Sequence, residues 1–205
     1  MIHFMRGTPY IYQGEEIGML NAHYPSIGQY RDVESLNYYQ ILLDQGKTEK
    51  EALETLAARS RDNSRTPMQW NGERYGGFSE AAPWLPMSAR FRKEITVEAQ
   101  QKDKDSILAF YKKLIAMRKT YPVIAEGGIS FLETGTDMVL AYQRILGEQR
   151  LVVLCNLDGK RQTIQTSGQW KDFKVLLENY EGREMALEEG TFTMEPYGFM
   201  VLISK

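Results

Sequence analysis

Near its beginning the chain reads Gly7-Thr8-Pro9-Tyr10-Ile11-Tyr12-Gln13-Gly14-Glu15-Glu16-Ile17-Gly18. The part from Thr8 to Gln13 is rich in aromatic and β-branched residues, and Gly14 ends it, so it predicts a strand followed by a loop. Its apolar character is typical of a buried parallel strand that leads into a functional loop. We therefore expect Glu15 and Glu16 at the carboxyl end of this strand.

These two adjacent carboxylates have two interpretations. They could be the acid and the nucleophile of a glycosidase, whose carboxyl groups lie roughly 5–5.5 Å apart in retaining enzymes. However, neighbouring residues of a strand point to opposite faces, so Glu15 and Glu16 could not easily flank one bond. The favoured interpretation is that one of them binds backbone groups and shapes the loop.

Helical patterns follow, with one long irregular segment between them. Apolar spacing predicts a helix over about 33–43 and another over 105–120, and Thr48 with Glu51 has the spacing of a capping box that begins a helix. Residues 60–94 are rich in Arg, Asn, Pro, Gly and Trp and have no period. Because aromatic residues anchor such a segment, it indicates an ordered functional loop rather than disorder.

After Gly127-Gly128 the apolar pattern changes to period two. Such alternation, with turn residues between the runs, is typical of short antiparallel strands. The expected strands are 129–133, 138–145, 150–156, 163–165, 173–178, 191–194 and 198–203. They predict a small antiparallel sandwich or barrel. We place a domain boundary near residue 125, which gives expected domains of 1–125 and 126–205.

The composition excludes several classes of function. The 205 residues include 25 Lys and Arg against 27 Asp and Glu, a net charge of −2, which argues against nucleic acid as a partner. A single cysteine, Cys155, excludes an internal disulfide framework and indicates a reducing compartment. No apolar run reaches the roughly eighteen residues that a membrane span needs. We expect a cytoplasmic protein without a membrane partner.

Neither a metal site nor a cofactor site is expected. His3 and His23 share no ligand-like spacing with each other or with Cys155. The chain has no glycine-rich phosphate loop and no Gly-x-Ser-x-Gly nucleophile motif.

The irregular segment begins Arg59-Ser60-Arg61-Asp62-Asn63-Ser64-Arg65-Thr66-Pro67-Met68-Gln69-Trp70. Its alternating arginines could bind a sugar or a phosphate through forked donors. Equally, the segment could be structural, with Arg65 bound to Asp62 or to carbonyl groups. Glu34, near the start of the first helix, could stabilise that helix end electrostatically or project into a site.

Three strings together are more specific than any one of them. Residues 7–18, the string Tyr30-Arg31-Asp32-Val33-Glu34-Ser35-Leu36-Asn37 and residues 60–70 resemble the α-glucosidases of glycoside hydrolase family 13. The resemblance is to the subgroup that contains oligo-1,6-glucosidase, dextran glucosidase and trehalose-6-phosphate hydrolase, and it weakens after about residue 125. It implies an α+β fragment, in which the C-terminal part of a (β/α)8 TIM barrel, with Thr8–Gln13 as the eighth strand, precedes a small antiparallel β-sandwich.

The resemblance also implies retaining hydrolysis through a covalent glucosyl-enzyme. The family's three catalytic carboxylates come from motifs upstream of Gly7, so we expect no catalytic residue in this chain and no activity of the chain alone. Glu34 and Arg61 are the implied substrate-binding residues, which would hydrogen-bond hydroxyls of the leaving group. The loop 60–94 would form a wall of the cleft.

Residues 60–65, Ser-Arg-Asp-Asn-Ser-Arg, resemble the trehalose-6-phosphate hydrolase version of this motif. That resemblance implies hydrolysis of trehalose 6-phosphate to glucose and glucose 6-phosphate. Two alternatives remain: an oligo-1,6-glucosidase or dextran glucosidase acting on α-1,6-linked gluco-oligosaccharides, and a non-catalytic carbohydrate-binding accessory module whose aromatic residues stack on sugars. In each case the expected partner is a small saccharide or a sugar phosphate. An uncovered barrel face further predicts self-association.

Overall fold

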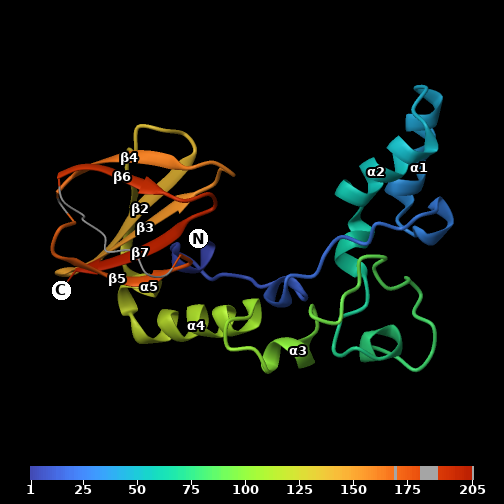
Figure 1. Cartoon of the computed structure of the whole chain (residues 1–205), viewed down its shortest axis with the longest axis horizontal. Helices are drawn as coiled ribbons and strands as arrows, with labels where there is room; N and C mark the ends of the chain where they lie inside the picture. Colours follow the sequence, from blue (N-terminus) through green and yellow to red (C-terminus); the bar gives the residue numbers. More distant parts are fainter. Residues whose placement is uncertain (169, 181–188, 205) are drawn as a thin grey trace. The chain divides into compact units, whose positions relative to one another are not determined.

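The computed structural model describes residues 1–168, 170–180 and 189–204. It consists of two compact units, one formed by Met1–Tyr10 with Leu114–Lys205 and the other by Ile11–Lys113 (Figure 1). Each unit has its own buried apolar cluster. The first ten residues therefore belong with the strand-rich unit, and the domain boundary near residue 125 stays a prediction.

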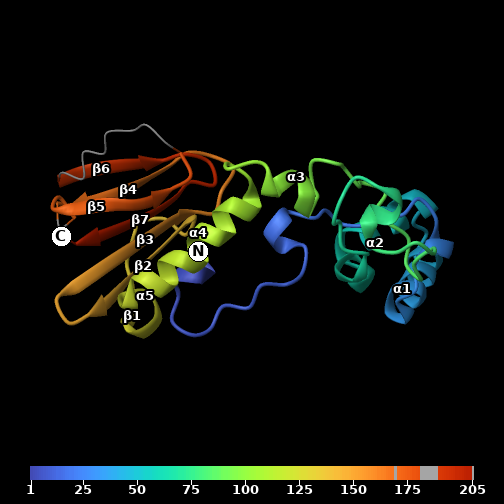
Figure 2. The same ribbon diagram turned by 90° about the horizontal axis from the view of Figure 1, so that it is seen from below.

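The strand-rich unit contains all seven predicted strands. They are β1 (Gly128–Phe131), β2 (Val139–Leu146), β3 (Gln149–Asn156), β4 (Gln162–Ser167), β5 (Phe173–Glu178), β6 (Glu189–Met194) and β7 (Phe199–Ser204). A five-stranded sheet has the order β1-β2-β3-β7-β5, and β4 pairs with β6 in a second sheet. Every pairing is antiparallel, and the views in Figures 1 and 2 show the β4–β6 pair to one side of the larger sheet.

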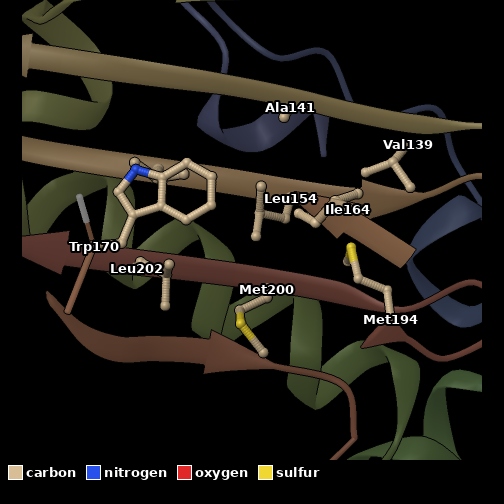
Figure 3. Close-up of a cluster of buried hydrophobic side chains, with 9 residues drawn as sticks. Val139, Ala141, Leu154, Ile164, Trp170, Met194, Met200 and Leu202 are labelled. Carbon is tan, nitrogen blue, oxygen red and sulfur yellow. The ribbon is translucent and has the colours of Figure 1, made fainter. Parts of the chain in front are cut away.

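The apolar cluster of this unit lies between the two sheets (Figure 3). Its members in β2, β3 and β7 are two residues apart, because alternate residues of a strand share one face. They are Val139, Ala141, Val152, Leu154, Ile164, Trp170, Met194, Met200 and Leu202. Burying a large apolar side chain of this kind contributes roughly 1.5–3 kcal/mol. The period-two pattern thus produces the predicted antiparallel sandwich.

The other face of β2 carries a fully buried arginine, Arg144. It donates hydrogen bonds to backbone carbonyl groups from three segments of the unit, at 2.6–3.2 Å. Two of these segments are the short helices η1 (Ile2–Phe4) and α5 (Pro122–Glu126), and the third is the start of β1. Pro122 stands at the first position of α5, where its missing N–H is not needed.

A second arginine, Arg118, also binds the first residues of the chain. It belongs to α4 (Ile107–Thr120), which confirms the helix expected over 105–120. Its guanidinium donates to the carbonyl oxygens of His3 at 3.1 Å and Met5 at 3.3 Å, and to that of Gly7. Residues 1–7 are therefore bound through their main chain to two arginines of the same unit.

The other unit is built around two helices, α1 (Val33–Asp44) and α2 (Glu49–Arg59), which pack against each other. The predicted capping box is confirmed, since Thr48 Oγ1 accepts from the Glu51 amide and the Glu51 carboxylate accepts from the Thr48 amide. The unit also contains the 3₁₀ turns η2 (Glu15–Ile17), η3 (Ile27–Gln29), η4 (Arg61–Arg65) and η5 (Arg74–Gly77) and the short helix α3 (Val97–Gln101). Residues 66–73 and 78–94 have no helix or strand, in keeping with the predicted irregular loop.

The strand predicted over Thr8–Gln13 is not formed. Its composition suits a strand, but an extended segment becomes one only when a neighbouring strand completes its ladder of hydrogen bonds. Among the described residues no segment pairs with it.

In the described part of the chain no helix is long and apolar enough to cross a membrane.

Candidate functional site

The structure brings together the two predicted substrate-binding residues, Glu34 and Arg61. Arg61 Nη2 lies 2.5 Å from Glu34 Oε2, and the two side chains are 65% and 68% exposed. Glu34 lies in the first turn of α1, where a carboxylate is favoured, and Arg61 begins η4 directly after α2. An ion pair this exposed contributes only about 0–1 kcal/mol to stability. Its charged atoms therefore remain accessible to a ligand.

The pair borders an open hollow of about 530 Å³ between α1 and the end of α2. That volume lies within the range of roughly 300–1,000 Å³ found for small-molecule sites. The hollow is lined by Asp32, Glu34, Ser35, Tyr38, Thr55, Leu56, Arg59, Ser60 and Arg61. This lining combines charged groups of both signs, hydroxyl groups and an aromatic ring, which suits a polar ligand with an apolar face.

Asp32 and two serines form the buried polar part of this lining. Asp32 Oδ2 accepts from the amide of Ser35 at 3.1 Å and from its hydroxyl at 2.8 Å, and the Ser35 and Ser60 hydroxyl oxygens lie 2.8 Å apart. Burial acts to raise the pKa of Asp32, but the hydrogen bonds from Ser35 and the charges of Arg61 and Arg65 hold that pKa below its ordinary value. Asp32 is thus a fixed anion that caps α1.

The segment η4 is held in place by Asp62, which is fully buried. Asp62 Oδ2 accepts from the amides of Arg31 at 2.7 Å and Asp32 at 2.9 Å. Arg65 Nη1 lies 3.6 Å from Asp62 Oδ1 and 3.5 Å from Asp32 Oδ1. The structural interpretation of Arg65 is therefore confirmed, while Arg61 is the arginine of η4 that lines the hollow.

Asn63 also holds this segment in place, through both the oxygen and the nitrogen of its side-chain amide. Its Oδ1 accepts from the Ala22 amide at 3.0 Å, and its Nδ2 donates to the Ala57 carbonyl at 3.0 Å. Residues 62 and 63 thus join the start of α1, the end of α2 and the segment around residue 22. In the sequence, Asp62 and Asn63 stand out because they belong to the Arg-Asp-Asn string. The sequence alone did not identify the groups to which they hydrogen-bond.

Glu15 and Glu16 form the start of η2 rather than the end of a strand. Glu15 Oε2 accepts from the Tyr12 amide at 3.2 Å, and Glu15 Oε1 accepts from the Tyr111 hydroxyl at 2.5 Å. Burial, followed by the hydrogen bond to Glu15 and the charges of Glu15 and Glu16, raises the pKa of Tyr111. The interpretation of one carboxylate as a backbone-binding residue that shapes the loop is confirmed.

Two further residues that hydrogen-bond to η2 could not be found from the sequence. Gln100, which is buried, donates from Nε2 to the Ile17 carbonyl at 2.6 Å and accepts on Oε1 from the Leu108 amide at 3.0 Å. Tyr111 is the second. Neither belongs to a motif, and only the tertiary fold brings them to η2.

No cluster of three or more His, Cys, Asp or Glu side chains suited to a metal ion occurs among the described residues. Cys155 is buried in β3, and burial raises the pKa of its thiol to about 11, slightly offset by the charge of the amino terminus. A thiol of that pKa is protonated and unreactive near neutral pH.

Two family profiles match the chain. One, described as the alpha amylase catalytic domain, matches residues 1–127, and the other, described as the alpha-amylase SusG C-terminal domain, matches residues 139–201. With the sheets described above, these matches confirm the predicted fold class, part of a TIM-barrel catalytic domain followed by an all-β domain.

Curated relatives and solved structures agree with these matches. The trehalose-6-phosphate hydrolase of Bacillus subtilis (strain 168) is 41% identical over 205 aligned positions, covering 98% of this chain and 36% of that protein. The oligo-1,6-glucosidase of Halalkalibacterium halodurans is 37% identical over 207 positions, covering 100% and 36%. A crystal structure of the trehalose-6-phosphate hydrolase of Bacillus licheniformis matches with a TM-score of 0.90 and 42% identity, covering 100% of this chain and 37% of that chain.

This chain spans little more than a third of the length of the relatives that it matches. The catalytic-domain profile nevertheless covers more than half of the chain itself. The chain belongs to the alpha-amylase family, glycoside hydrolase family 13.

Proposed function

We propose that this chain is the C-terminal portion of a retaining α-glucosidase and that the hollow beside Glu34 and Arg61 holds the leaving-group sugar. The observation that carries the proposal is the exposed ion pair at 2.5 Å on the rim of that hollow. A carboxylate accepts and a guanidinium donates, so together they match a sugar hydroxyl, which does both. Such contacts orient the substrate without taking part in bond breaking.

The chemistry itself is assigned to carboxylates of the preceding part of a longer protein. Both carboxylates of the hollow are already engaged, Glu34 with Arg61 and Asp32 with Ser35, which supports a binding role for them. The chain alone is therefore expected to be inactive. Measurable release of nitrophenol from an aryl α-glucoside by the purified chain would contradict this assignment.

For the substrate we propose trehalose 6-phosphate, cleaved to glucose and glucose 6-phosphate. Relatives named trehalose-6-phosphate hydrolase are 41% and 42% identical to the chain, against 35% to 39% for those named oligo-1,6-glucosidase. The alternative is hydrolysis of α-1,6-linked gluco-oligosaccharides. The test compares kcat/KM of the longer protein for trehalose 6-phosphate and isomaltose. A higher value for trehalose 6-phosphate is expected, and the reverse order would move the assignment to oligo-1,6-glucosidase.

A second candidate function is favoured by two exposed indoles. Trp70 and Trp84 are 49% and 63% exposed in the irregular loop, and such rings can stack on sugars. The chain would then be a non-catalytic carbohydrate-binding module. Calorimetry of the chain with maltose distinguishes the two proposals, because saturable binding that is lost in Trp84→Ala but kept in Glu34→Gln supports the module.

The remaining proposals concern the setting of the protein. We assign it to the cytoplasm, with a domain boundary near residue 125 and with self-association through the apolar face of residues 1–125. Val33 and Ile41 of α1, at 68% and 47% exposure, are apolar side chains that self-association would cover. Light scattering of the purified chain tests the last point, and a monomeric mass at all concentrations would contradict it.

A further inference from the structure

The hollow beside Glu34 contains a second arginine, Arg59, whose charge is not neutralised within the described part of the chain. Arg59 is the last residue of α2, is exposed and lines the hollow. Arg61, by contrast, is paired with Glu34, and Arg65 lies between Asp32 and Asp62. Among the described residues no carboxylate lies within ion-pair distance of Arg59. Of the three arginines at this end of α2, Arg61 and Arg65 are thus paired with carboxylates of the described residues, and Arg59 is not.

The acidic groups of the hollow are already engaged. Asp32 is held by Ser35 and Arg65, and Glu34 by Arg61. A cation at the last position of α2 is itself favoured, because the carbonyl end of a helix carries partial negative charge. The sequence thus places Arg59 where it is stable without a carboxylate, and its guanidinium remains available on the wall of a site of ligand size.

We infer that Arg59 binds the phosphate group of a phosphorylated sugar whose ring occupies the hollow. The inference deepens the proposed function, on which it rests, by assigning the anionic part of the substrate to a named residue. A guanidinium presents parallel N–H donors that match two phosphate oxygens, an arrangement that a neutral oligosaccharide does not use. Arg59 is then a specificity-determining residue that separates a sugar phosphate from a neutral disaccharide.

The rest of the lining fits a sugar ring attached to that phosphate. Glu34 and Arg61 supply an acceptor and donors for hydroxyl groups at the rim. Tyr38, 44% exposed, supplies an aromatic surface within the same lining. The hydroxyl of Thr55 donates to the Glu51 carbonyl of its own helix, so it does not compete with Arg59 for the phosphate. The phosphate is therefore assigned to the guanidinium rather than to a hydroxyl.

The experiment is an NMR titration of the full 205-residue chain with glucose 6-phosphate, glucose and inorganic phosphate. We compare the natural chain with Arg59→Gln, Arg59→Lys and the control Lys50→Gln, a cation of the same helix that is paired with Glu54. The expected result is a Kd for glucose 6-phosphate about tenfold higher in Arg59→Gln, partly restored in Arg59→Lys and unchanged in Lys50→Gln. The Kd for glucose is expected to be the same in all four chains.

Three results would overturn the inference. One is no saturable binding of glucose 6-phosphate to the natural chain, and another is equal affinity of the natural chain and Arg59→Gln. The third is binding of inorganic phosphate as tight as that of glucose 6-phosphate, which would show that the sugar ring contributes nothing. Because none of these measurements requires turnover, they are independent of the hydrolase assay: a longer protein that fails to cleave trehalose 6-phosphate would refute the proposed function and leave the Arg59 result standing.

Discussion

Arg144 Nη1 donates a hydrogen bond of 2.7 Å to the carbonyl oxygen of Phe4, which lies 140 positions earlier in the chain. The same guanidinium binds the carbonyls of Ile124, Gly127 and Gly128, and it is completely buried. Burial lowers the pKa of Arg144, and so do the charges of Arg118 and Arg6, but an arginine stays protonated at any ordinary pH. Backbone oxygens therefore replace water around a buried cation.

Replacing Arg144 by Met should destabilise the strand-rich unit strongly. The change leaves four carbonyl groups without their donor, and the loss of a partner inside a buried polar network costs about 3–5 kcal/mol. Urea unfolding of the chain measures the effect. Arg150→Met, at an exposed position of β3, is the matched control and should change the free energy of unfolding by less than about 0.5 kcal/mol. Equal losses in the two variants would contradict the assigned function of Arg144.

Replacing Asp62 by Ala should unfold or loosen the start of α1. The amides of Arg31 and Asp32 lose their acceptor, and a charge-assisted hydrogen bond of this kind contributes about 1.5–3 kcal/mol. The control is Asp44→Ala, since Asp44 is exposed and accepts only a side-chain bond from Gln40. Thermal unfolding gives the comparison. Hydrogen exchange at the two amides provides a local readout, and unchanged protection of both in Asp62→Ala would refute the prediction.

The stability of the unit 11–113 should depend on pH through Asp32. The pKa of this carboxyl is lower in the folded chain than its ordinary value of 3.8, so the unfolded chain binds the proton more readily. Its contribution is therefore complete above about pH 4 to 5 and is lost as the pH falls through the folded-state pKa. Urea midpoints at several pH values should show the natural chain and Asp32→Asn converging as the pH falls below about 4. A difference that stays constant down to pH 3 would contradict this.

Glu34→Gln and Arg61→Gln should leave stability nearly unchanged but weaken substrate binding. The pair is exposed, so its removal should cost less than about 1 kcal/mol in unfolding experiments. In the longer protein, each change should lower kcat/KM for trehalose 6-phosphate roughly tenfold, because one charged contact to the sugar is lost. Glu54→Gln on the solvent side of α2 is the control. Unaltered kinetics in both site variants would exclude the pair from the binding site.

Local patterns predicted the fold well where neighbouring residues decide it. The strands β2 and β3 need only side chains that alternate between the two faces of a sheet, and Thr48 needs only Glu51 three positions on. Arg144 shows the limit, because period two in β2 places it opposite the sandwich core, and its burial depends on α5 and η1, which no local pattern connects to it.

For the candidate site, the sequence likewise identified individual residues but not the contacts between them. The motifs identified Glu34 and Arg61, but their contact is created by the packing of α1 on α2. Arg59 carried no individual expectation, since a pattern does not show which of three arginines lacks a carboxylate. The prediction of a strand over Thr8–Gln13 was wrong for a related reason. The composition of a strand can be read from neighbouring residues, whereas its partner strand comes from a distant part of the chain.

Arg118 and Arg144 hold the first seven residues through main-chain oxygens, which every amino acid carries. Substitutions that accumulate at exposed positions of this segment, such as Arg6, therefore leave both sets of hydrogen bonds intact. Loss of either arginine, in contrast, is not repaired by any change within the segment. Over evolutionary time the residues here can diverge quickly while the course of the backbone stays the same, and sequence identity will understate how well the segment's structure is retained.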